Sequence, residues 1–121
     1  MISRGFTAEA LLKLPVKVRG IQLGWPVDVI LDGDASRALG LDVLCGDDTH
    51  RFLPLAAADV RADVIEVGSA LTLLTDVELE FYRSRGSTLR ELRARRGLRD
   101  VAFGEGWLVD ELLAEEPAPA A

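Results

Sequence analysis

The sequence has very few of the residues that covalent cross-links and metal centres require. Cys45 is the only cysteine and His50 the only histidine among 121 residues. An intrachain disulfide is therefore impossible, and a zinc site would lack a second His or Cys ligand. No apolar run approaches the roughly 18 residues of a membrane span, and no long apolar N-terminal segment precedes a cleavage site. We expect a cytoplasmic protein without a membrane span, metal or cofactor.

The overall composition of the chain is typical of a single folded domain. Hydrophobic residues make up 49% of the chain, which excludes disorder on composition. A domain of this length buries about two-thirds of its unfolded surface, so it can hold a core without cross-links. The net charge of -6 disfavours nucleic acid as a partner for the whole surface.

After a short helix predicted over residues 7–14, capped by Thr7 and stopped by Pro15, the pattern becomes β-rich. Short apolar runs alternate with Gly/Asp turns, a pattern typical of a small antiparallel barrel or sandwich. The predicted strands are Val27–Leu31, Leu39–Cys45, Thr49–Leu55, Asp63–Val67 and Leu71–Leu74. In the first two strands, alternation places Val27, Val29 and Leu31, and Leu39, Leu41, Val43 and Cys45, each on one face. We expect Val29, Leu31, Leu41 and Val43 in the core.

Two capping boxes predict helices further along the chain. Thr75 and Glu78 open the first, which runs to about residue 84 with Val77 and Phe81 on one face. Gly86 is placed to end that helix in the left-handed conformation.

Thr88 and Glu91 open the second helix, with Leu89 and Leu92 inward and Gly97 at its end. A hairpin is predicted after it, from Leu98–Phe103 through Gly104-Glu105-Gly106 to Trp107–Leu113.

Two segments of the chain show a weak internal similarity. Val27-Asp28-Val29 and Arg99-Asp100-Val101 each precede a glycine-containing turn and a second strand. Each is also preceded by a Gly-x-x-Leu segment, at Gly20 and at Gly86. This internal similarity is explained either by duplication of one unit or by the chance similarity that any hairpin protein shows.

The β-rich segment resembles the PRC-barrel family over about residues 15–74. The residues that carry the resemblance are Val27 to Asp32, Gly33, Leu39 to Leu44, Phe52 to Leu55 and Asp63 to Val67. Members of that family include the cytoplasmic domain of the photosynthetic reaction-centre H subunit and the C-terminal domain of a ribosome-maturation factor. Neither the membrane helix of the first nor the extra N-terminal barrel of the second is present in this sequence. The resemblance implies a small barrel used for protein contacts, hence an adaptor or scaffold and not an enzyme.

The expected fold is mainly β, a small antiparallel PRC-barrel-like barrel with two or three short α-helices. Residues 1–114 form one domain, with the core barrel over about 15–74, helices over about 76–96 and a C-terminal hairpin over about 98–113. The Pro/Ala-rich residues 115–121 are expected to be a flexible tail.

Two groups of residues invite a chemical interpretation. Cys45 and His50 could form a nucleophile–base pair, but Cys45 continues an apolar alternation, and a buried core thiol is the simpler interpretation. Asp47, Asp48 and His50 could ligate a metal, but a solvated turn explains the same residues. We expect no catalytic residues.

The most informative charge feature is an arginine-rich segment. Residues 83–99 hold seven arginines and one acid, Glu91, a local charge of 7 - 1 = +6. This segment is either an anion-binding face or a solvated surface whose arginines pair with the protein's own acids, and we favour the second. The candidate partner-binding residues are Arg83, Arg85, Arg90, Arg93, Arg96, Trp25 and Trp107.

Two hypotheses follow from these features. The first is a non-enzymatic adaptor that binds another protein or forms a homodimer, with Trp25 and Trp107 either anchoring an interface or, in our preferred interpretation, closing the core. The second is an RNA- or ribosome-associated factor that uses the arginine-rich segment, and its binding would weaken steeply with salt.

Overall fold

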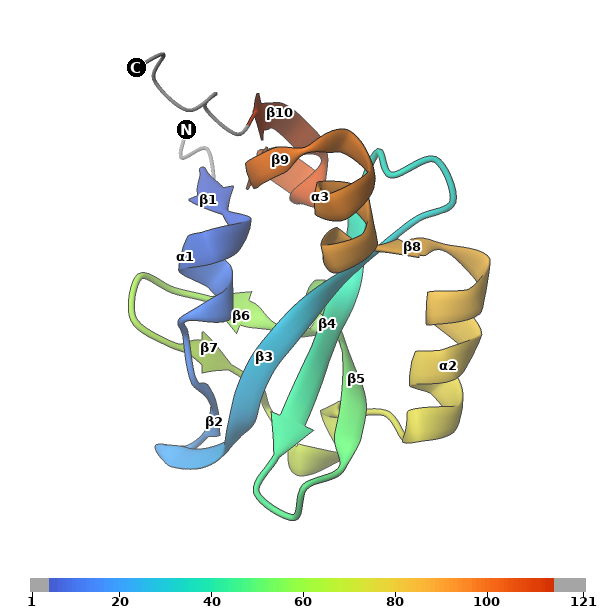
Figure 1. Ribbon diagram of the computed structural model, residues 1–121. Coiled ribbons are helices and arrows are strands. Elements are labelled where there is room, and N and C mark those ends of the chain that lie inside the picture. The colour runs from blue at the N-terminus through green and yellow to red at the C-terminus, as the bar shows by residue number, and fades with distance from the viewer. Residues whose placement is uncertain (1–4, 115–121) are drawn as a thin grey trace, which may run out of the picture.

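The computed structural model describes residues 5–114, which form two β-sheets and three α-helices (Figure 1). The helices are α1 (Ala8–Leu12), α2 (Asp76–Arg85) and α3 (Leu89–Arg96). The larger sheet contains β2 (Val16–Val18), β3 (Ile21–Leu31), β4 (Ala38–Cys45), β5 (His50–Pro54), β6 (Asp59–Val60), β7 (Ile65–Glu66) and β8 (Ser87–Thr88). The smaller sheet contains β1 (Phe6–Thr7), β9 (Leu98–Phe103) and β10 (Val109–Ala114).

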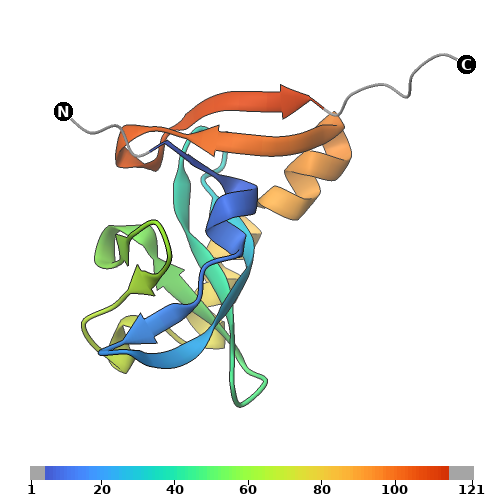
Figure 2. The same ribbon diagram turned by 90° about the vertical axis from the view of Figure 1, so that its left-hand side faces the viewer.

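The strand order shows how far the expected architecture holds. The larger sheet has the order β5-β4-β3-β2-β7-β6 with β8 paired to β3, and the smaller has the order β1-β9-β10. The smaller sheet lies across one end of the larger one (Figure 2). The prediction of a mainly β fold is confirmed, but neither sheet of the described residues closes on itself, so a barrel is not shown. The tail predicted over 115–121 lies outside the described residues.

One predicted strand is wrong. Residues 70–72 form a 3-10 turn, in which the Ser69 hydroxyl accepts a hydrogen bond from the Leu71 N–H. Leu71 is largely exposed, and Leu74 forms an isolated antiparallel bridge with Phe52. The local capping bond therefore outweighs the β-propensity of the Leu-Thr-Leu-Leu run.

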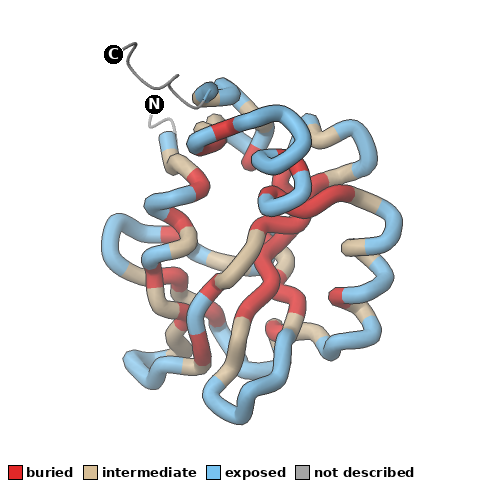
Figure 3. The backbone as a smooth tube through the Cα atoms, viewed as in Figure 1, coloured by how far each residue is buried: buried red, intermediate tan, exposed pale blue. Residues whose placement is uncertain are grey.

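The core lies mainly on one face of the β3–β4 pair. Figure 3 shows that buried residues are concentrated along these two strands. Val29, Leu31, Leu41 and Val43 are fully buried there, as their alternation predicts. Leu39 and Val27 are the exceptions. β4 has a bulge at Leu39, between the partners of Leu31 and Ile30, and Leu39 packs on the opposite face. β3 has a register shift at Val27, between Pro26 and Asp28, and Val27 is only partly buried.

A second, smaller apolar cluster joins the opposite face of β3–β4 to α2. It consists of Ile30, Phe52 and Leu79, with Leu39 and Tyr82 packed against it. Leu79 is the residue of α2 that points to the sheet. Val77 and Phe81, which the sequence places on one common face of the helix, are 73% and 48% exposed, so that shared face points away from the core.

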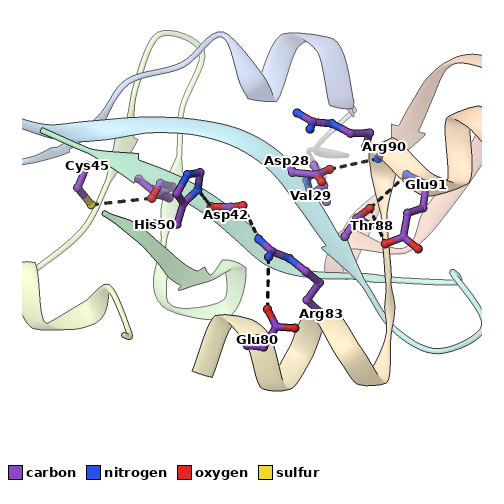
Figure 4. Close-up of polar contacts among 11 residues, drawn as sticks. Asp28, Val29, Asp42, Cys45, His50, Glu80, Arg83, Thr88, Arg90 and Glu91 are labelled. Atoms are coloured by element: carbon purple, nitrogen blue, oxygen red, sulfur yellow. Dashed lines mark hydrogen bonds and ion pairs between the residues drawn. The ribbon is translucent and has the colours of Figure 1, made fainter. Parts of the chain in front are cut away.

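Two aspartates build the same local arrangement in the two halves of the chain. The Asp28 Oδ1 accepts hydrogen bonds from the N–H groups of Val29 (2.8 Å) and Arg90 (3.2 Å), as Figure 4 shows. The Asp100 Oδ1 accepts from Val101 (2.8 Å) and Glu9 (3.0 Å). Each aspartate thus satisfies the second N–H of a helix that comes from the other half of the chain.

The short strand before each of these two helices also pairs in the same register relative to the aspartate. Thr7, the N-cap of α1, pairs with Ala102, two residues after Asp100. Thr88, the N-cap of α3, pairs with Ile30, two residues after Asp28. The internal similarity predicted around Asp28 and Asp100 therefore corresponds to the same arrangement made twice: an aspartate on a strand caps a helix from the other half of the chain. The capped helices begin after Thr7 and Thr88 and not at the Gly-x-x-Leu segments.

The two helix-ending glycines differ in conformation. Gly97 has φ +61°, the left-handed conformation predicted for it. Gly86 does not adopt that conformation, since its φ is -112°. Glycine is required there by space, because a Cβ at this position would lie 2.0 Å from the Leu31 carbonyl oxygen.

Candidate functional site

Three side chains form a row across the face of the larger sheet next to α2. Leu44 of β4 is the register partner of Trp25 on β3 and of His50 on β5. Paired residues of neighbouring antiparallel strands project to the same face, so these three side chains lie side by side. The Trp25 side chain is 46% exposed. We call this row, together with Arg83 of α2, the α2-side face.

A buried carboxylate fixes the polar part of the α2-side face (Figure 4). Asp42, two residues before Leu44 on β4, is only 4% exposed. Its Oδ1 lies 2.8 Å from the His50 Nδ1, and its Oδ2 accepts a hydrogen bond from the Arg83 guanidinium at 2.8 Å. Arg83 also reaches Glu80 at 3.4 Å. A buried charge is tolerated when it is paired and hydrogen-bonded, and the two partners here are held in place by it.

Two open cavities adjoin this network. One has a volume of about 340 Å³ and the other about 380 Å³, and both are bordered by His50 and Asp76. The first is also lined by Thr49, Arg51 and Thr75, and the second by Leu79, Glu80 and Arg83. The surface is hollowed on the side of His50 that faces α2.

The Asp42–His50 pair is the one arrangement in the α2-side face that resembles acid–base machinery. A carboxylate on Nδ1 orients an imidazole for proton transfer at Nε2, but nucleophilic catalysis also needs a nucleophile within hydrogen-bond reach. In residues 5–114, no hydroxyl or thiol is hydrogen-bonded to His50. The geometry therefore positions an imidazole at the surface and supplies no second reacting group.

Cys45 does not join His50. Because Leu44 and His50 share one face of the sheet, Cys45 projects to the other, where it packs against the main core. Its thiol lies 3.9 Å from the Val43 carbonyl oxygen. Burial raises the pKa of the Cys45 thiol above its ordinary value of 9.0, which disfavours the thiolate.

The alternative interpretation of Asp47, Asp48 and His50 as metal ligands has no geometric support in the part of the chain that the structure describes. No group of three or more His, Cys, Asp or Glu side chains is placed there to hold an ion. The Asp47 carboxylate instead accepts a hydrogen bond from the Thr49 N–H at 3.2 Å, closing the turn before His50. The Thr49 hydroxyl also donates to Asp47, and this bond is the main reason why the pKa of the Asp47 carboxyl is lowered.

The arginines of the 83–99 segment are mostly not neutralised by the protein's own acids. Arg83 forms ion pairs with Asp42 and Glu80. The Arg85 guanidinium lies 4.5 Å from the centre of the Phe81 ring, a cation–π contact. Arg93 donates to the Leu98 carbonyl oxygen at 3.4 Å.

Apart from Arg83, the arginines of this segment are exposed. In residues 5–114, six arginines of the segment form no ion pair with an acid at 4.0 Å or less: Arg85, Arg90, Arg93, Arg95, Arg96 and Arg99. Our preference for internal pairing is thus supported for Arg83 alone. The other arginines form an exposed basic surface on α3 and beside it.

The two tryptophans have different roles. Trp107 is 6% exposed, and its ring lies 5.9 Å from Phe6 and 6.2 Å from Phe103 between ring centres. It closes the core under the smaller sheet, so Trp107 is not available as an interface anchor. Trp25 lies on the surface and remains a candidate.

Among the predicted partner-binding residues, the structure brings Trp25 and Arg83 to the same face. Sequence reasoning missed Asp42, which connects Arg83 to His50. The available signal was a lone carboxylate inside the apolar run Leu39–Cys45, because a charge in such a position requires partners.

Comparison of the chain with protein-family models, curated proteins and solved structures found no match. None of the helices in residues 5–114 combines the length and apolar character needed to cross a bilayer.

Proposed function

We propose that this chain is a non-enzymatic protein-binding adaptor of the PRC-barrel type, and that the α2-side face is its docking surface. The observation that carries the proposal is the row of Trp25, Leu44 and His50 beside Arg83, with His50 and Arg83 held by the buried carboxylate of Asp42. Tryptophan and arginine are the side chains most enriched among residues that dominate binding energy at protein interfaces.

Pre-organisation supports a binding role for these groups. A side chain that is already fixed in the free protein loses less conformational entropy when a partner binds, and affinity rises accordingly. Asp42 anchors both polar members of the face at 2.8 Å. The adjoining cavities are open to solvent, which suits the side chains of a protein partner better than a small molecule that must be enclosed.

The PRC-barrel assignment is part of the proposal and rests on the resemblance over residues 15–74. Strands β2 to β5 are consecutive antiparallel neighbours, and β3 carries register shifts that bend it. We infer that the larger sheet is an open form of such a barrel. A cytoplasmic location is part of the proposal, since the chain's single cysteine is a free thiol.

The test is an interaction measured with matched surface variants. The tagged protein captures partners from an extract of the source organism, and each candidate is then purified and titrated against it. We expect Trp25→Ala to weaken binding of the true partner at least about tenfold, as for a residue that anchors an interface. Leu112→Ala on β10, which changes a comparably exposed apolar residue away from this face, should leave binding unchanged. Equal binding by all three proteins would contradict the proposal.

A second candidate function is RNA or ribosome association through the exposed arginines. It is favoured by the lack of an ion pair within 4.0 Å for Arg96 in the described residues. Binding of single-stranded RNA that is strong at about 50 mM salt and collapses at about 200 mM would support it. Substituting Arg90, Arg93 and Arg96 with glutamate should abolish that binding, whereas the adaptor proposal expects no RNA binding at either salt concentration.

A further inference from the structure

Helix α2 has a second apolar face that points away from the protein. Leu79 anchors the helix to the sheet and is 2% exposed. Val77 and Phe81, four residues apart, lie on the opposite side, since residues at this spacing share one face of a helix. We call Val77, Phe81 and the adjacent Arg85 the outer strip of α2.

The charges along α2 are separated by sign. Its acidic residues Asp76, Glu78 and Glu80 occupy the first half, and its basic residues Arg83 and Arg85 occupy the second half. Arg83 and Glu80 are already paired with each other. Arg85 is exposed and Glu78 is partly exposed, and on a helix of 3.6 residues per turn they lie on the same flank of the outer strip. The Glu78 carboxylate also accepts a hydrogen bond from the Thr75 hydroxyl at the start of α2.

We propose that the outer strip of α2 is a self-complementary interface at which a second copy of this chain docks in antiparallel orientation, with Phe81 beside the two-fold axis. Four helical residues span about 6 Å, so Arg85 lies as far beyond Phe81 as Val77 lies before it. With the axis at Phe81, Arg85 of one copy is level with Val77 of the other and beside its Glu78. Symmetry repeats this contact on the other side of the axis.

Charge complementarity selects this occupant and this orientation. A parallel arrangement of two α2 helices would place acid beside acid and arginine beside arginine. The antiparallel arrangement pairs opposite charges and also opposes the two helix dipoles. Phe81 gains apolar cover from its symmetry mate, while Arg85, which already lies 4.5 Å from the Phe81 ring, is placed between the ring and the second copy's Glu78.

The size of the strip determines the strength of the contact. Ten residues of helix are about 15 Å long, and the strip has two apolar side chains, so the interface falls in the small class that is formed transiently. The dimer should therefore depend on protein concentration. The inference goes beyond the proposed function, because the outer strip faces away from the α2-side face and leaves both copies of Trp25 accessible.

Sedimentation velocity of the full chain over a range of concentrations tests the inference. We expect the apparent mass of wild type to rise with concentration from 13.1 kDa toward twice that value. Phe81→Glu should stay monomeric throughout. The matched control Leu112→Glu places the same charge at another exposed apolar residue, on β10, and should associate like wild type.

An exchange of charges tests the register. Glu78→Arg alone and Arg85→Glu alone should each weaken association about tenfold, because each replaces two attractive surface contacts with two repulsive ones. The double variant restores opposite charges and should recover near-wild-type association. Glu78→Arg also removes the carboxylate that accepts the Thr75 hydroxyl at the start of α2, so thermal melts check that each variant is folded.

Three results would overturn the inference: a wild type that is monomeric at every concentration, a Phe81→Glu variant that dimerises like wild type, or a double variant no better than the single ones. None of these results affects the capture experiment with Trp25→Ala, so failure of the dimer and failure of the proposed docking face are distinguishable.

Discussion

Asp100 should be one of the most important polar residues for stability. It is 5% exposed, and its Oδ1 accepts two backbone hydrogen bonds, from Val101 on its own strand and from Glu9 in the first turn of α1. Replacing Asp100 with alanine removes both acceptors at once. The N–H of Val101 is then left buried without a partner, and α1 loses part of its N-terminal capping.

The magnitude follows from these two losses. A buried donor left unsatisfied costs about 1–3 kcal/mol, and loss of a helix-capping acceptor costs about 0.5–2 kcal/mol. We expect Asp100→Ala to lower the free energy of unfolding by about 2–4 kcal/mol. Asp100→Asn retains an oxygen acceptor in the same place and should cost about 1 kcal/mol or less.

The equivalent residue in the other half of the chain provides the internal control. Asp28 makes the same two kinds of hydrogen bond but is only half-buried, so water can replace part of what alanine removes. Asp28→Ala should therefore cost less than Asp100→Ala, about 1–2 kcal/mol. Urea denaturation of the four proteins gives the ranking. If Asp100→Asn proves as damaging as Asp100→Ala, the loss comes from charge and not from the backbone bonds, and the reasoning is refuted.

Three further outcomes can be checked on the same purified protein. Alkylation of Cys45 should be slower in the native protein than in urea, with a pH midpoint above 9.0, because burial raises the pKa of its thiol; rapid labelling at neutral pH would contradict this. Gly86→Ala should lower the free energy of unfolding by about 3 kcal/mol, since its Cβ would overlap the Leu31 carbonyl oxygen; a urea midpoint like that of wild type would show that the backbone there can yield. Burial raises the pKa of the Asp28 carboxyl above 3.8, so the folded state holds this proton more tightly than the unfolded chain. As pH rises above 3.8, wild type should therefore lose stability relative to Asp28→Asn. Urea unfolding of both proteins at several pH values between about 3 and 6 measures this difference. The opposite trend would refute a raised pKa for Asp28.

Local signals were sufficient for α3 but only partly for α2, where Thr75 is the N-cap but makes no side-chain hydrogen bond to a helix N–H. The Thr88 hydroxyl accepts a hydrogen bond from the Glu91 N–H at 3.1 Å, and Gly97 ends the same helix in the left-handed conformation, both as the sequence predicts. These features depend on residues within one or two turns of each other. The apolar alternation also correctly placed Val29, Leu31, Leu41 and Val43 on one face, because strand geometry alone assigns alternate residues there, but it failed at Leu39, where a bulge interrupts β4.

The sequence failed where distant residues decide the outcome. The spacing of Val77 and Phe81 predicts that they share one face of α2 but not where that face points, because the side that faces the sheet is determined by Leu79 and by the bond from Arg83 to Asp42. Arg83 and Asp42 are 41 residues apart, and no local pattern reveals that they meet.

The candidate site shows the same division. Trp25 and Arg83 could be named as partner-binding candidates from residue type alone. Their position on one face depends on the register that pairs Trp25 with Leu44 and Leu44 with His50. Trp107 has the same residue type as Trp25, and only its contacts with Phe6 and Phe103 show that it belongs to the core.

Site-specific photo-crosslinking in living cells tests the adaptor proposal most directly. A photoreactive phenylalanine derivative replaces Trp25 in one strain and Leu112 in another, and the products are separated by mass after irradiation. The account predicts a discrete protein adduct from position 25 that is absent from position 112 and is lost when His50 and Arg83 are both changed to alanine. The same adducts from both positions, or adducts to RNA and none to protein, would contradict it.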